Sequence, residues 1–161
     1  MNAAEQAKSV DTASKIAAVV NHFKAEFPDA KADLKPWAND RDTRELVDPD
    51  SIDIGFHLPG FSHRFQSRSI LVQIRLHQDL DEPINQENLN QSASPVNVPS
   101  CRAIGTDIAG FDHRGKQWQL STVARWQVEG NVSPESEIQE KLKRFCRHVF
   151  ELFNGAQEFS S

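Results

Sequence analysis

The residues of this chain that could do chemistry are charged and imidazole side chains that alternate with apolar ones along four stretches of sequence. Arginine presents a planar fork that binds carboxylates and phosphates, and histidine exchanges protons near neutral pH. If the apolar positions of each stretch face a core, the polar positions face together to the opposite side of a sheet. The candidate ligand- or partner-binding residues on that side are Asp53, His57, Arg75, His77, Asp107 and Arg125.

This polar face supports two interpretations. An anion-binding floor built on the arginines, or a general acid–base pair such as His57 with Asp53, is chemically possible. A one-sided antiparallel sheet, however, turns polar residues to water in any case. Cross-strand charge pairs on such a face contribute only about 0.2–1 kcal/mol each. Leu71 and Val123 also fall on this side, which indicates a cover: a protein partner, a second copy of the chain, or its own long loop.

Motifs of common catalytic and cofactor sites are missing from the sequence. It contains no Gly-x-Ser-x-Gly elbow, no phosphate-cradling loop and no dinucleotide fingerprint. The six histidines are scattered, and Cys101 and Cys146 have no metal or redox spacing. We therefore predict no catalytic residue, no metal and no cofactor, which is more typical of a binding protein than of an enzyme.

Charge and hydropathy narrow the class of partner and the location. A net charge of −5 opposes general binding of nucleic acid. The loop around Phe61 and Phe65 interleaves aromatic with basic residues, which keeps nucleic-acid binding as a weaker alternative. No stretch resembles a secretory signal or a membrane span, so we expect no membrane association and a cytoplasmic location.

The best-determined part of the predicted sheet is a hairpin over residues 103–127. Its even-numbered apolar residues, from Ile104 to Trp126, share one face only if paired residue numbers add to an even sum. A three-residue loop ending in a left-handed Gly115 meets this condition. Ile108 should then face Leu120, Asp107 should face Ser121, and Asp112 should face Lys116. Small inward residues such as Gly110 indicate where a helix approaches.

Two further strands and two helices complete the prediction. Alternation predicts strands over 51–58 and 68–78, with strand order left open. Helical spacing predicts a helix from Val10 to Phe27 capped by Asp11, and a second one capped by Ser133 and closed at Asn154-Gly155. Residues 79–100 read as a long polar loop, which is either mobile or a lid or partner-docking segment, and residues 156–161 read as a frayed tail.

Together these patterns predict one α+β domain over residues 1–161. A four-stranded antiparallel sheet, made of two hairpins, carries an N-terminal and a C-terminal helix on one face. The first functional hypothesis is a non-enzymatic protein-binding or assembly module that uses the polar sheet face, with a protein partner or a homo-oligomer. The alternative is a small-molecule or anion-binding protein, including an enzyme, with a His/Arg/Asp site on that face.

Overall fold

A computed structural model describes residues 3–36, 51–78, 101–123 and 125–154. The expected loop over 79–100 and the expected tail over 156–161 lie outside these residues. The elements, in chain order, are α1 (Ala3–Gln6), α2 (Val10–Glu26), β1 (Lys31–Asp33), β2 (Ser51–Ser62), β3 (Ser67–Gln78), β4 (Cys101–Asp112), β5 (Gly115–Ser121), β6 (Gln127–Gly130) and α4 (Ser136–Asn154).

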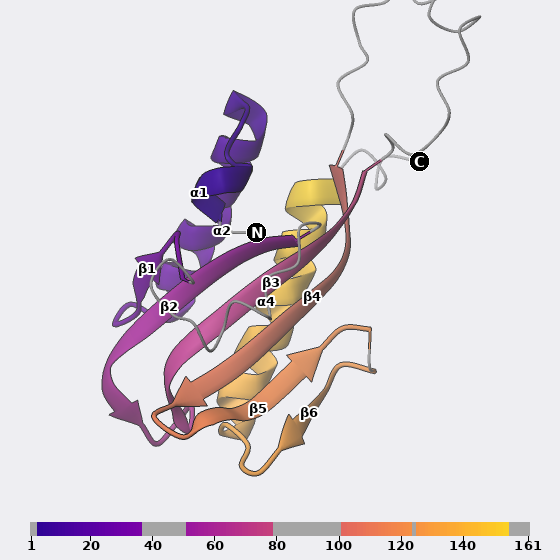
Figure 1. Cartoon of the computed structure of the whole chain (residues 1–161). Coiled ribbons are helices and arrows are strands. Elements are labelled where there is room, and N and C mark those ends of the chain that lie inside the picture. The colour runs from indigo at the N-terminus through magenta and orange to yellow at the C-terminus, as the bar shows by residue number, and fades with distance from the viewer. Residues whose placement is uncertain (1–2, 37–50, 79–100, 124, 155–161) are drawn as a thin grey trace, which may run out of the picture.

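The protein is α+β, with an antiparallel sheet and a helix toward each end of the chain (Figure 1). The described strands form a sheet of six, not four, in the order β1-β2-β3-β4-β5-β6. Short strands at the two edges, β1 and β6, account for the difference. β6 arises because the second arm of the predicted hairpin ends at Ser121, after which the chain reverses and Gln127–Gly130 pair antiparallel with β5. Arg125 and Trp126 lie between them with φ of 64° and 59°, which no continuous strand can contain.

Helices α2 and α4 pack on the same face of the sheet, as the alternation predicts. Phe23 of α2 stacks on Phe56 of β2 with 3.9 Å between ring centroids, and Phe145 of α4 meets Phe23 edge-on at 5.2 Å. Ser9, not Asp11, caps α2 by accepting the Thr12 amide, and α4 begins at Ser136, later than predicted. The apolar stripes of both helices are buried in this core.

The register of the central strands confirms part of the predicted hairpin. Asp107 pairs with Ser121 and Ile108 with Leu120, and Gly115 has a φ of 103°. The turn itself is different, because Asp112 pairs with Gly115 and the extra residue of the bulge falls at Gln117. A second shift, between Arg75 and Leu76, turns Ala103 into the core and leaves Ile104 61% exposed. Ile104 was therefore wrongly predicted to face inward.

Gly110 makes room for a side chain rather than for a helix. A Cβ atom at this position would lie 2.8 Å from Cζ2 of Trp118 and closer still to the Nε1 and Cε2 atoms of that ring. The ring is buried, and its Nε1 donates to the carbonyl oxygen of Phe65 at 2.6 Å. This bond ties β5 to the turn between β2 and β3.

Candidate functional site

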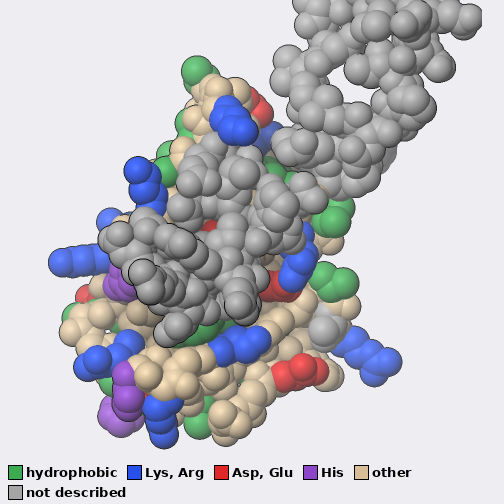
Figure 2. All heavy atoms as spheres, in the orientation of Figure 1, with side chains coloured by type: hydrophobic (Ala, Val, Ile, Leu, Met, Phe, Trp, Pro, Cys, Tyr) green, Lys and Arg blue, Asp and Glu red, His purple; other side chains and the backbone are tan. Residues whose placement is uncertain are grey.

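The predicted polar face exists as a row of side chains that runs across four strands. The register places Asp53 of β2 opposite Gln73 of β3, Gln73 opposite Asp107 of β4, and Asp107 opposite Ser121 of β5. All four therefore lie on the side away from the helices. Figure 2 shows Lys and Arg side chains scattered singly over this view of the molecule.

Asp107 is held from two sides. Its Oδ2 accepts from Nε and Nη2 of Arg75 at 2.7 and 2.6 Å, and its Oδ1 accepts from Ser121 Oγ at 2.6 Å. The carboxylate is buried, whereas the Arg75 side chain is 44% exposed. Because the guanidinium already has a carboxylate as its partner, Arg75 is poorly placed to act as an open anion receptor.

Asp53 is fully buried, which the sequence prediction of a water-facing residue did not anticipate. Ser51 Oγ donates to its Oδ1 at 2.7 Å, and Gln73 Nε2 approaches the same oxygen at 3.4 Å. A carboxylate removed from water must be hydrogen-bonded to be tolerated. The chain after β1 helps to cover this face, which Gly55 shares with Asp53. If Gly55 were replaced by a residue with a Cβ atom, that atom would lie 3.1 Å from Pro36 Cβ.

Two other candidate residues, His57 and Arg125, do not join this row. His57 lies on β2, four residues after Asp53. Its imidazole bridges Ser69 Oγ at 3.0 Å and Asp33 Oδ2 at 3.1 Å. Arg125 is exposed in the turn before β6, so the prediction that placed it on a strand is wrong. The backbone of His77 pairs with that of Arg102 at the end of β3.

The Ser69–His57–Asp33 chain has the composition of a charge-relay system, and sequence reasoning missed two of its members. The donor and acceptor atoms are within hydrogen-bonding distance. The His57 side chain is, however, 53% exposed. None of the three residues lines the cavity beside Phe65 or the one beside Trp118 in the described part of the chain. Among those described residues, no group of three His, Cys, Asp or Glu could hold a metal ion.

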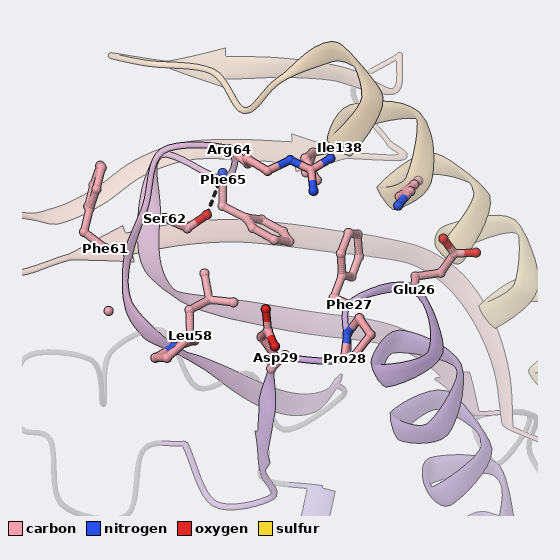
Figure 3. Close-up of a pocket in the computed structure, with 14 residues that line it drawn as sticks. Glu26, Phe27, Pro28, Asp29, Leu58, Phe61, Ser62, Arg64, Phe65 and Ile138 are labelled. Carbon is pink, nitrogen blue, oxygen red and sulfur yellow. Dashed lines mark hydrogen bonds between the residues drawn. The ribbon is translucent and has the colours of Figure 1, made fainter.

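A groove at the C-terminal end of β2, directly after His57, is the better-formed concave site. It encloses about 190 Å³ between the end of α2, the tip of the β2–β3 hairpin and the start of α4 (Figure 3). Phe27, Phe65 and Ile138 are buried in its floor, while Leu58 and Phe61 on its wall remain partly accessible. We call this site the hairpin groove.

Three breaks in regular structure create the hairpin groove. Pro28 has no amide hydrogen and cannot continue α2. The chain therefore turns through residues 28–30, and residues 31–33 then pair with β2 as strand β1. The pairing of β1 with β2 starts only at Lys31 opposite His57. Residues 58–61 of β2 extend beyond it, and the β2–β3 register resumes only at Ser62 opposite Ser67. An edge of β2 is thus left beside the cavity.

The hairpin tip is fixed to the body of the protein, so the groove wall is held in place. Ser62 Oγ accepts from the Phe65 amide at 3.2 Å (Figure 3), and the Arg64 carbonyl oxygen accepts from the Glu135 amide at 2.8 Å. The Arg64 side chain also pairs with Glu135 at 3.0 Å and Glu137 at 3.4 Å. These two carboxylates, the first of them through a hydrogen bond, raise the pKa of the Arg64 guanidinium.

The charges around the groove are balanced except at one residue. Lys141 pairs with Glu137 at 3.7 Å, and Glu26 with Arg144 at 3.8 Å. Asp29 is exposed and makes no ion pair with any residue of the described ranges. Its carboxylate points into the cavity between Leu58 and Phe27 (Figure 3).

Part of this site was visible in the sequence as the aromatic and basic loop around Phe61. Phe65 of this loop is buried in the core and 5% exposed, whereas Phe61 is 40% exposed. Ion pairs with glutamates occupy Arg64, so this loop offers less to a phosphate than its composition indicates.

Comparisons with known proteins identify a family but no activity. A family model described as a domain of unknown function matches residues 4–155. Neither a curated protein nor a solved structure matches the chain. Over the described residues, no helix is long and apolar enough to cross a membrane.

Proposed function

Because the chain belongs to this family of domains of unknown function, we propose its role from the geometry alone: it is a protein-binding module that holds a segment of another protein in the hairpin groove. The observation that carries this proposal is a cavity with an apolar floor beside an edge of β2 that extends past its neighbouring strand. Extended peptides bind at such edges through main-chain hydrogen bonds, with pockets that select side chains.

The size of the groove supports a macromolecular ligand over a cofactor. Pockets for drug-sized molecules measure about 300–1,000 Å³, whereas this cavity measures about 190 Å³. That volume suits one or two side chains of a partner whose main chain lies outside it. The polar face is less suited to docking, because Asp53 and Asp107 are buried and already hydrogen-bonded.

Selection of peptides from a random phage-displayed library on the full chain tests this proposal. Enriched peptides should bind in fluorescence anisotropy and lose at least about tenfold in affinity, or about 1.4 kcal/mol, on Leu58→Asp and on Phe61→Ser. Val123→Ser is the matched control, because Val123 is 70% exposed and lies outside the groove lining. An unaltered circular dichroism spectrum shows that each variant is still folded, so that a loss of peptide affinity can be assigned to the groove.

Two outcomes would overturn the proposal. One is a set of enriched peptides that bind Leu58→Asp and Phe61→Ser as tightly as the original chain, or none enriched at all. The other is a dimer in light scattering that Phe61→Ser dissociates, since a second copy would then occupy the groove.

A second candidate function rests on the Ser69–His57–Asp33 chain, which is the arrangement of a nucleophile with a base and an orienting carboxylate. A hydrolase built on it would cleave p-nitrophenyl acetate, with the rate lost in Ser69→Ala and His57→Gln. Equal rates for the original chain, both variants and buffer would eliminate this candidate.

A further inference from the structure

The chemistry of the hairpin groove specifies its occupant more closely. Building on the proposed function, we infer that the partner segment is extended and carries an arginine or lysine beside an apolar residue, with the cation bound by Asp29 and the backbone added along β2 at residues 58–61. The apolar neighbour enters the cavity over Phe27 and Phe65.

The first support is the charge of the groove. Its basic residues already have acidic partners: Arg64 has Glu135 and Glu137, and Lys141 has Glu137. The Asp29 carboxylate has no such partner among the described residues and is aimed at the cavity (Figure 3). An acidic segment would meet this carboxylate without a free cation to offset it, whereas a cationic segment supplies the missing charge.

The second support is the surroundings of that carboxylate. Asp29 sits next to Leu58 and Phe27, and Lys141 Nζ already lies 5.9 Å from the centroid of the Phe27 ring. Arginine and lysine carry apolar stems that pack on such surfaces while their charged ends reach a carboxylate. A guanidinium can also stack on an aromatic face.

The third support is the backbone of β2. Beyond His57, the described register gives residues 58–61 no paired residue in β1 or β3. Pro59 has no amide hydrogen, but Leu58, Gly60 and Phe61 keep both backbone groups. A segment running antiparallel to β2 in place of β1 can therefore make main-chain hydrogen bonds at alternate residues.

Three pools of acetylated and amidated nonapeptides test the inference. Each pool has Leu or Phe beside a central residue that is Arg, its neutral analogue citrulline, or Glu, with the other positions random. We expect the Arg pool to bind the full chain about 1.5-fold to fivefold more tightly than the citrulline pool, the range of an exposed ion pair. The difference should shrink in about 0.5 M salt.

Charge variants of the protein make the test specific. Asp29→Asn should abolish the preference for Arg over citrulline, and Asp29→Lys should favour the Glu pool. Glu129→Gln removes the same charge from β6, four strand positions from β2, and should leave the preference unchanged. N-methylation of alternate peptide amides should abolish binding if the backbone adds to β2.

The results separate this inference from the proposed function. If Arg and citrulline pools bind alike, or the preference survives Asp29→Asn, the inference about the cation is wrong, while loss of binding in Leu58→Asp would still support the groove. Retained binding of N-methylated peptides would overturn strand addition alone. Failure of all three pools, together with an unenriched phage library, would overturn both.

Discussion

The fit of Trp118 against Gly110 gives a prediction with a calculable magnitude. In Gly110→Ala the new methyl group would overlap the Trp118 ring, since its Cβ would lie 2.8 Å or less from three atoms of that ring. The ring is 1% exposed, so the side chain or the strand must move. Overpacking of this kind costs about 1–3 kcal/mol.

Movement of the ring has a second consequence. It lengthens or breaks the 2.6 Å bond from Trp118 Nε1 to the Phe65 carbonyl oxygen, and a buried polar group left unpaired costs about 1–3 kcal/mol. We therefore expect a loss of about 2–6 kcal/mol in the free energy of unfolding. For a chain of this size that is a fall in Tm of about 4–24 °C.

Urea denaturation followed by circular dichroism measures this loss, with an unchanged m-value as the sign that only stability has altered. Gly60→Ala is the matched control, because a Cβ there meets nothing within 4 Å and the change should stay within about 1 kcal/mol. A Gly110→Ala variant within about 0.5 kcal/mol of the original chain, the range of an ordinary surface substitution, would refute the reasoning.

Three further predictions concern buried polar and titratable groups. Asp107→Asn should destabilise the fold by about 1–3 kcal/mol through loss of the charge paired with Arg75, and purely additive effects with Arg75→Met in a double-mutant cycle would contradict the pairing. Burial raises the pKa of the Cys146 thiol to about 12, so iodoacetamide at about pH 8 should alkylate it only as urea unfolds the chain; alkylation of the native protein at the unfolded rate would disprove this. Burial, followed by the neighbouring His148, lowers the pKa of His22 from its usual 6.5. The unfolded chain therefore binds a proton that the folded chain resists, and stability falls as the pH drops below 6.5. His22→Gln should reduce the dependence of the urea midpoint on pH between about pH 7 and 5, whereas His63→Gln should not. An equal change of midpoint with pH in both variants would contradict the assignment.

The sequence alone determined the faces of the central strands and of both long helices. Alternation at a period of two and helical spacing are local properties of the chain, so Ile108 opposite Leu120 and Asp107 opposite Ser121 could be predicted from parity. The helical stripes of α2 and α4 could be recognised in the same way.

Bulges and the strand break depended on contacts that no local pattern contains. Ala103 turns into the core where the Asn154 side chain, at the end of α4, bonds both its amide and its carbonyl group. The turn that ends β5 leaves Trp126 near Phe150 and Arg147 of α4, with ring centroids 6.2 Å apart and the guanidinium 5.5 Å from the Trp126 ring. Both features join residues that are distant in sequence.

Tertiary structure also decided which polar residues could form a site. Parity correctly grouped Asp53, Arg75 and Asp107 on one side, but it carries no information on what lies above that side, and two of the three are buried. The hairpin groove brings together residues 26–30, 58–65 and 138–141. Because these segments meet only when α2 and α4 pack on the sheet, their shared cavity and the direction of the Asp29 carboxylate are properties of the packing.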